Sequence, residues 1–115
     1  MKNYLLSASV LLFLLLTTCS KKEVVAKCYN ENPIEELGWL KTAVQGFQKP
    51  KSGPLTVSAM VFRNEMYFVL TNPYVSSPMS YIFNCQGKTI GQLGIHYNTF
   101  IGEAKLFKVF LNQNY

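Results

Sequence analysis

The sequence lacks most of the residue types on which enzyme active sites depend. Its 115 residues include no aspartate, six glutamates and a single histidine, His96. A catalytic base needs a partner that orients it and adjusts its pKa, and no such partner lies near His96 in the sequence. The aspartate-rich spacing of calcium loops is absent, and there is no Cys-x-x-Cys pair or Cys/His cluster for zinc. We therefore expect no catalytic residues, no metal site and no cofactor.

The glutamates, glycines and lysines do not supply an alternative chemistry. Glu35 and Glu36 are adjacent, so on a helix they point in different directions and make a poor pair for hydrolysis. Gly87, Gly91 and Gly94 fall in an expected turn and strand, without the following helix of a phosphate-binding loop. The formal net charge is +5, but the lysines are scattered and not interleaved with aromatic residues. A nucleic-acid partner is therefore not expected.

The hydrophobic residues are concentrated in one run near the start of the chain. Residues 4–16, "YLLSASVLLFLLL", follow Lys2 and precede small polar residues. The run is shorter than the roughly 20 apolar residues of a membrane-spanning helix. A core helix would show a polar face, and this run has almost none. The order of a basic start, an apolar stretch and small residues is typical of a secretory signal peptide.

The end of this run carries a more specific motif. Leu16-Thr17-Thr18-Cys19 resembles the lipobox of bacterial lipoproteins. The resemblance implies that a dedicated signal peptidase cuts before Cys19, which then carries a thioether-linked diacylglycerol and an N-acyl chain. One acyl chain anchors a protein only marginally, whereas several on one residue hold it firmly. Cys19 is therefore predicted to be the site of lipidation.

The same resemblance implies a location and a domain organisation. Residues 1–18 would be the signal peptide and residues 19–31 a lipidated tether, which leaves residues 32–115 as a small domain, whose α+β class is argued below from its own pattern. The protein would be attached to a membrane of the cell envelope by its lipid, facing the periplasm or the cell surface. Ser20 stands where some lipoproteins carry an aspartate that retains them at the inner membrane, which favours the outer membrane.

The remaining cysteines can then be considered as a pair. Three cysteines are an odd number, which is awkward for an exported protein. If Cys19 is lipidated, Cys28 and Cys85 remain, and an oxidising compartment would allow them to form a disulfide. The alternative is that both are independent buried thiols.

The polar and apolar pattern of residues 32–48 predicts an amphipathic helix. Asn32 is a good N-cap and Pro33 suits the first helical position. Leu37, Leu40, Val44 and Phe47 recur at three- and four-residue spacing and form one apolar face. Lys49 and Pro50 close the helix. Trp39 lies off the main face and is expected to pack at its edge, the alternative being exposure to a partner.

The rest of the domain predicts strands. Residues 55–62 and 66–71 alternate around a turn at Arg63-Asn64-Glu65, and residues 66–71 are apolar enough for a central strand. Residues 81–85 and 88–95 are expected as two further strands around a turn at Gln86-Gly87. Residues 100–104 are expected to form a turn or short helix, followed by a strand. The expected fold class is α+β, with one N-terminal amphipathic helix packed on an antiparallel sheet of about four strands.

A second resemblance concerns this globular part. The helix opening at residues 32–40 and the sequence Asn84-Cys85-Gln86-Gly87-Lys88-Thr89-Ile90 are similar to features of small uncharacterised bacterial lipoprotein domains. Those domains imply a shared α+β fold, and they provide no catalytic residues to carry over.

The best candidates for recognition lie in the proline- and serine-rich segment of residues 72–80. Aromatic side chains on irregular loops suit binding, so Tyr74, Val75 and Tyr81 are predicted binding residues. The alternative is that the tyrosines only cap the core. The expected function is a lipid-anchored, non-catalytic binding or interaction domain with an envelope protein as its partner. The alternative is a small enzyme or a protein that handles lipids or small ligands in an apolar pocket near His96.

Overall fold

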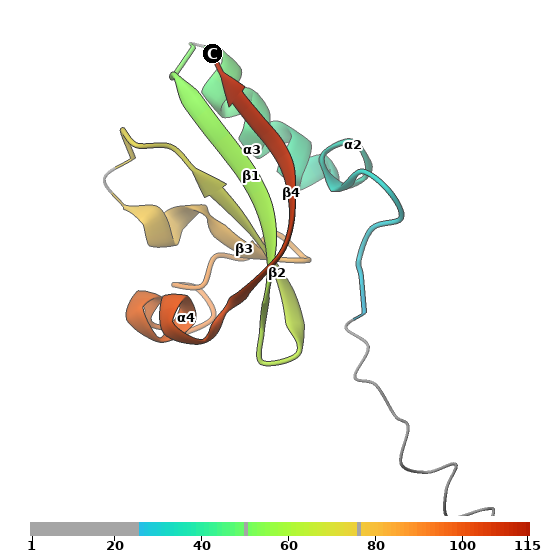
Figure 1. Cartoon of the computed structure of the whole chain (residues 1–115), viewed down its shortest axis with the longest axis vertical. Coiled ribbons are helices and arrows are strands. Elements are labelled where there is room, and N and C mark those ends of the chain that lie inside the picture. The colour runs from blue at the N-terminus through green and yellow to red at the C-terminus, as the bar shows by residue number, and fades with distance from the viewer. Residues whose placement is uncertain (1–25, 50, 76) are drawn as a thin grey trace, which may run out of the picture.

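Four strands form one antiparallel sheet in the computed structural model, which describes residues 26–49, 51–75 and 77–115. The elements are α2 (Pro33–Glu36), α3 (Gly38–Gln48), β1 (Pro54–Phe62), β2 (Glu65–Thr71), the 3₁₀ helix η2 (Pro78–Tyr81), β3 (Ile82–Asn84), α4 (Tyr97–Glu103) and β4 (Lys105–Asn114). The strand order is β3-β2-β1-β4. Figure 1 shows α3 beside β1 at one end of the sheet and α4 at the other end. The expected α+β class and four-stranded antiparallel sheet are confirmed.

A tight hairpin joins the two central strands. β1 and β2 pair from Thr56–Thr71 to Phe62–Glu65. Arg63 and Asn64 have φ angles of 50° and 64°, the positive values that a two-residue hairpin turn requires. This turn and both strands were predicted from the alternation of the sequence, and the structure confirms them.

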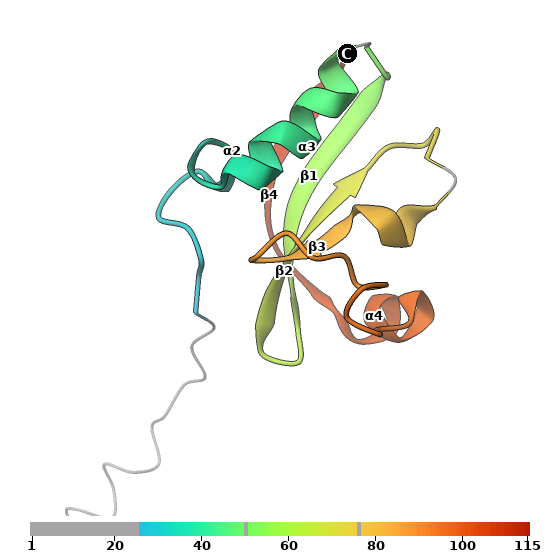
Figure 2. The same ribbon diagram turned by 180° about the vertical axis from the view of Figure 1, so that it is seen from behind.

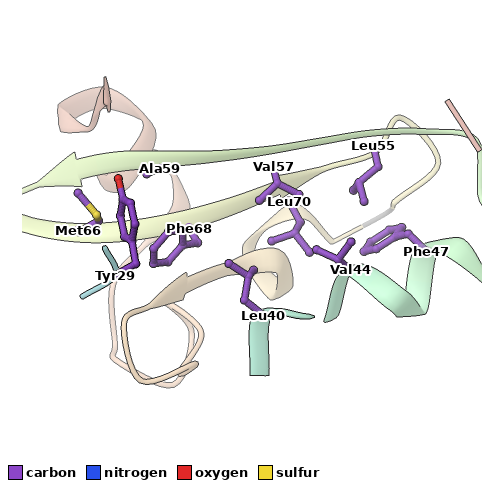
Figure 3. Close-up of a cluster of buried hydrophobic side chains, with 10 residues drawn as sticks. All are labelled: Tyr29, Leu40, Val44, Phe47, Leu55, Val57, Ala59, Met66, Phe68 and Leu70. Carbon is purple, nitrogen blue, oxygen red and sulfur yellow. The ribbon is translucent and has the colours of Figure 1, made fainter. Parts of the chain in front are cut away.

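The sheet is covered on both faces, and each face has its own apolar cluster. The first cluster joins α3 to β1 and β2 (Figure 3) and comprises Tyr29, Leu40, Val44, Phe47, Leu55, Val57, Ala59, Met66, Phe68 and Leu70. The second cluster lies on the α4 face and comprises Phe62, Tyr67, Ile82, Ile90 and Phe100. Because successive side chains of a strand point to opposite faces, β2 contributes to both clusters, which explains its nearly continuous apolar sequence.

The segment that was expected to be one helix forms two. Leu37 separates α2 from α3 and adopts an extended conformation with φ −98° and ψ 105°. The backbone groups at this break stay satisfied, since Leu37 N–H donates to Pro33 and the Leu37 carbonyl accepts from Leu40 and Lys41. Gly38 directly follows, and glycine weakens helix continuity by about 1 kcal/mol. Leu37 nevertheless packs against the first cluster.

The strand predicted for residues 88–95 is wrong. These residues mostly form turns, and their only β-bridge to the sheet among the described residues joins Phe83 to Thr89. Thr89 and Gln92 hydrogen-bond to each other's backbone N–H groups through their side chains. Such local bonds compete with a strand ladder, and Gly94 adopts a positive φ of 72°. The short helix and the strand predicted from residue 100 onward are present as α4 and β4, and β4 is the fourth strand, paired with β1 at the opposite edge of the sheet.

The folded part begins earlier than expected. Cys28 and Tyr29 fall within residues 19–31, the segment predicted to be a tether. Tyr29 is only 8% exposed and packs in the first cluster, and Cys28 is bridged to Cys85. The signal segment 1–18 and the candidate lipidation residue Cys19 lie outside the described residues.

Candidate functional site

A groove opens between α3 and residues 72–75 and 77–81. Its volume is about 500 Å³, and we call it the α3 groove; its lining residues are Ala43, Gly46, Phe47, Ser52, Asn72, Tyr74, Val75, Ser77, Ser80 and Tyr81. Figure 2 shows α3 along β1, with the loop that follows β2 on the other side of β1 in this view. None of the lining side chains carries a charge. The groove therefore suits a ligand whose contacting part is uncharged.

Asn72 fixes the start of the segment that forms the outer wall. Its side chain is buried, at 6% exposure. The amide group donates to the Ser52 carbonyl oxygen at 2.9 Å, and the amide oxygen accepts from Tyr74 N–H at 2.8 Å. The Asn72 backbone carbonyl also accepts from Val75 N–H at 3.1 Å. Asparagine commonly forms turns of this kind, and here the turn ties the loop to the start of β1.

Tyr74 stands at the rim of the groove and is 79% exposed. Its ring lies against Gly53, where a Cβ atom would come within 2.9 Å of the ring. Gly53 has a φ of 84°, a conformation that favours glycine. Because Gly53 has no side chain, the Tyr74 ring can pack against its backbone.

Tyr81, at the end of the same segment, also lines the groove. Its ring packs edge-on against Phe47 of α3, with ring centroids 5.2 Å apart. Tyr81 is half-buried, so part of the ring supports the core and part faces the groove. An aromatic ring held in this way loses little conformational freedom when it binds a partner.

The three predicted binding residues therefore meet in one groove. The prediction did not include the α3 wall, formed by Ala43, Gly46 and Phe47. Nothing lies within 4 Å of the position that a Cβ atom would take at Gly46. A glycine within a helix is the one sequence signal for this wall, because Gly46 leaves this part of the α3 surface without a side chain.

A second cavity of about 230 Å³ lies on the α4 face of the sheet. Its lining residues are Ser58, Met60, Val69, Leu70, Thr71, Asn72, Val75, Pro78, Ile82, Tyr97 and Ile101. It shares Asn72 and Val75 with the α3 groove, so the 72–75 segment lies between the two. His96 precedes α4 and is exposed. No histidine or glutamate is among the lining residues of either cavity.

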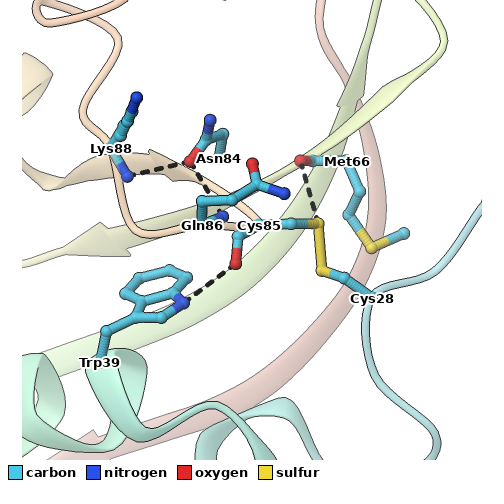
Figure 4. The surroundings of a disulfide bond; sticks show 7 residues. All are labelled: Cys28, Trp39, Met66, Asn84, Cys85, Gln86 and Lys88. Carbon is cyan, nitrogen blue, oxygen red and sulfur yellow. Dashed lines mark hydrogen bonds between the residues drawn. A yellow bond between two sulfur atoms is a disulfide. The ribbon is translucent and has the colours of Figure 1, made fainter.

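The disulfide between Cys28 and Cys85 lies near Trp39, at the N-terminal end of α3 (Figure 4), and its Cα atoms are 6.0 Å apart. Trp39 Nε1–H donates to the Cys85 carbonyl oxygen at 3.0 Å. The Trp39 ring also packs against Phe68 and Phe83, which confirms that it packs at the edge of the helix face. The bridge therefore ties the start of the folded chain to the turn after β3, and it resolves the open question about these two cysteines.

The titratable side chains whose pKa values are shifted have structural roles. Hydrogen bonds from the backbone N–H groups of Asn30, Glu31 and Asn32 lower the pKa of Glu36. Burial raises the pKa of Tyr67, and the nearby Glu65 carboxylate raises it further. Arg63 forms a two-point ion pair with Glu103, at 3.0 and 3.2 Å, which raises the pKa of the guanidinium. None of these groups lines the α3 groove.

Two further properties concern metals and membranes. Within the described ranges, no group of three or more His, Cys, Asp or Glu side chains is arranged to hold a metal ion. No helix in that same part of the chain has the length and apolarity needed to cross a bilayer.

Comparison of the chain with protein-family models, curated proteins and solved structures found no match.

Proposed function

We propose that this protein is attached to the cell envelope by a lipid on Cys19 and that its folded domain is a non-catalytic binding module. The apolar run of residues 4–16 and the lipobox-like Leu16-Thr17-Thr18-Cys19 support the anchor. The outer membrane is the proposed location, because Ser20 replaces the aspartate of lipoproteins that stay at the inner membrane. The disulfide agrees with this proposal, since disulfides persist in oxidising compartments.

The α3 groove is the proposed binding site, and one observation carries this choice. Tyr74, Val75 and Tyr81 line a single groove of about 500 Å³, which is within the usual range of ligand sites. Its polar lining residues are tyrosine, serine and asparagine. This composition resembles that of antibody binding loops, in which tyrosine provides rigid contact area and serine provides adaptable hydrogen bonds. The proposed ligand is an uncharged segment of an envelope protein.

The helix and the sheet provide the frame for this site. In the proposal, the apolar face of the helical region packs on the antiparallel sheet and holds one wall of the groove rigid. Leu40, Val44 and Phe47 are the buried residues of α3. A rigid wall loses little conformational entropy when a partner binds. Any adjustment to the partner is therefore expected on the loop side of the groove.

Photocrosslinking in intact cells tests this proposal. A photoreactive benzoyl-phenylalanine at Tyr74 should crosslink to one envelope protein reproducibly, and that protein can be identified by mass spectrometry. The same probe at Gln92, which is exposed on the turns after β3, is the matched control and should not give this product. Identical products at both positions, or none at Tyr74, would reject the groove as the binding site.

The second cavity supports a second candidate, a domain that holds a small apolar ligand. Met60, Val69 and Ile101 give this cavity an apolar lining, and Tyr97, the neighbour of His96, contributes to it. His96 itself has no part in this candidate, since it does not line the cavity. Native mass spectrometry of protein extracted from the envelope tests it: a bound small molecule that is lost on Ile101→Trp would support this function over the first.

A further inference from the structure

Strand β4 forms one edge of the sheet and exposes a strip of apolar side chains. Leu106 is 62% exposed, and Phe107 and Val109 are each 46% exposed. Leu106 pairs with Met60 and Val109 pairs with Ser58, which places both on the α4 face of the sheet. Ile101 of α4 is also exposed, at 47%. Clustered exposed apolar residues of this kind usually mark an interaction surface.

The other side of the same strand is basic. Lys105 pairs with Val61 and Lys108 pairs with Ala59, so both lysines lie on the α3 face. The Lys108 ammonium group is 5.4 Å from the centre of the Phe110 ring. The one acidic residue near the start of β4, Glu103, is paired with Arg63. β4 therefore presents aliphatic side chains on one side of its edge and cationic side chains on the other.

The start of the described chain lies against this strand. Tyr29 packs edge-on against Phe110, with ring centroids 5.2 Å apart, and the Lys27 ammonium group is 5.6 Å from the Tyr29 ring. Cys19 precedes Ala26 by seven residues, which span at most about 25 Å when fully extended. A lipid on Cys19 would therefore hold β4 close to the bilayer.

The geometry of β4 disfavours a partner that adds a strand to the sheet. Its register with β1 shifts twice, between Val57 and Ser58 and between Ala59 and Met60. These shifts leave Phe110 and Phe107 as extra residues on β4. Bulges and edge lysines are features by which proteins block strand addition. In a pairing of two copies, the lysines of both β4 strands would also add like charges to one interface.

We propose that the β4 surface, formed by Lys27, Ile101, Lys105, Leu106, Lys108 and Val109, rests on the headgroup region of a bilayer that contains anionic phospholipid. The lysines contact lipid phosphates, and the aliphatic side chains enter the boundary between headgroups and acyl chains, as in other proteins that bind membrane surfaces. At this depth the free backbone groups of the β4 edge stay hydrated. The inference rests on the proposed lipid anchor for the way in which the protein reaches the bilayer.

Lipid-dependent fluorescence quenching tests this contact. The protein, purified from envelopes in its processed form, carries a bimane label on Phe107→Cys or, as a control, on Leu93→Cys. Leu93 is also an exposed aliphatic residue, but it lies in the turns after β3, beyond the opposite edge of the sheet. In nanodiscs of brominated phosphatidylcholine and phosphatidylglycerol, the label at 107 should lose about threefold more fluorescence than the label at 93.

Two changes should then reduce the quenching of the label at position 107 and leave that of the label at position 93 unchanged. These are the removal of phosphatidylglycerol from the nanodisc, which needs no change to the protein, and the double variant Lys105→Gln/Lys108→Gln. Equal quenching at 107 and 93 in acylated protein would overturn the proposed contact and leave the anchor intact. Burial of the label at 107 by a copurified envelope protein, without quenching by lipid, would overturn it in favour of a protein partner.

The intact mass of the protein separates this inference from the anchor itself. A mass without acyl chains, together with quenching at 107 on added anionic vesicles, would reject the anchor and retain the surface contact. An acylated mass without quenching at 107 would retain the anchor and reject the surface contact.

Discussion

The indole N–H of Trp39 donates a hydrogen bond to the carbonyl oxygen of Cys85, and the same ring lies directly over Gly87. The hydrogen bond measures 3.0 Å. A Cβ atom at Gly87 would come within 2.9 Å of Trp39 Cγ and Cδ2. Trp39 thereby joins α3 to the turn that carries the disulfide, and the absence of a side chain at Gly87 permits this contact.

Gly87→Ala should destabilise the domain for two reasons. Gly87 has a φ of 81°, and this left-handed conformation costs a residue other than glycine about 1–2 kcal/mol. The new methyl group would also displace the Trp39 ring. We expect a lower melting temperature and altered Trp39 fluorescence, since Trp39 is the only tryptophan in the chain.

Gly102→Ala is the matched control for this prediction. Gly102 lies within α4 and has open space where a Cβ atom would be. Alanine there should leave the stability unchanged or increase it by about 0.5–1 kcal/mol. A loss of stability at Gly102 similar to that at Gly87 would contradict the explanation based on φ and on Trp39.

Reduction of the Cys28–Cys85 disulfide should weaken the domain without changing its fold. The two residues are separated by 57 positions, and closing a loop of this length stabilises a protein by about 4 kcal/mol in the chain-entropy model. This is a large share of the stability of a small domain. Thermal unfolding followed by circular dichroism, with and without reductant, measures the effect. Complete alkylation of both cysteines in the exported protein before any reduction would show that the bridge does not form.

Local signals in the sequence were sufficient for most elements of the fold. Asn32 caps α2 through a bond from Ile34 N–H, and the hairpin at Arg63-Asn64 follows from the alternation on either side. Residues 88–95 alternate as a strand would, but they mostly form turns. The side chains of Thr89 and Gln92 bind each other's backbone N–H groups, and such local bonds compete with the pairing of a strand. The pairing of β4 with β1 could not be deduced either, because it depends on contacts far apart in the sequence.

The candidate site shows the same division. The loop residues Tyr74, Val75 and Tyr81 were identifiable because aromatic residues stood among prolines and serines. The opposite wall was not, because its position depends on how α3 packs against the sheet. Asn72 is similar: its role comes from the Ser52 carbonyl, which is twenty residues away.

Variants of Gly53 and Tyr74 should separate the binding role of the groove from its structural role. Tyr74→Ala removes an exposed ring, so it should change the stability by less than about 0.5 kcal/mol while it weakens partner capture. Gly53→Ala should both strain a φ of 84° and push the Tyr74 ring aside. We therefore expect Gly53→Ala to lower both stability and binding. Pull-downs and melting curves of the two variants measure these effects; unchanged binding in Tyr74→Ala would remove Tyr74 from the proposed site.

Cys19→Ser should abolish lipidation and leave an unprocessed precursor. The cysteine thiolate is the nucleophile that acquires the lipid, and serine at this position cannot replace it. Metabolic labelling with a fatty-acid probe measures the result. Cys28→Ser is the matched control: it loses the disulfide but should retain the label. Labelling that persists in Cys19→Ser would exclude Cys19 as the lipid site.

The stability of the domain should depend on the ionisation of Glu36. Its carboxylate accepts hydrogen bonds from the backbone N–H groups of Asn30, Glu31 and Asn32, at 2.7, 2.9 and 2.7 Å. These bonds favour the charged form and lower the pKa of Glu36 in the folded protein. In the unfolded chain the pKa of glutamate is about 4.3. The stabilisation is therefore fully present above this value, and it is lost as the pH falls from there through the lower pKa of the folded state.

Glu36→Gln should accordingly destabilise the domain at neutral pH and should do so less in acid. The neutral amide has only one acceptor oxygen, so it cannot replace a carboxylate that binds three N–H groups through two oxygens. We expect the difference in melting temperature between the wild type and Glu36→Gln to be constant near pH 7 and to shrink below about pH 4. Glu31→Gln, at a neighbouring exposed position, controls for the loss of one negative charge. A difference between wild type and Glu36→Gln that stays the same down to pH 2, or that Glu31→Gln reproduces, would show that the three backbone hydrogen bonds do not depend on the charge of Glu36.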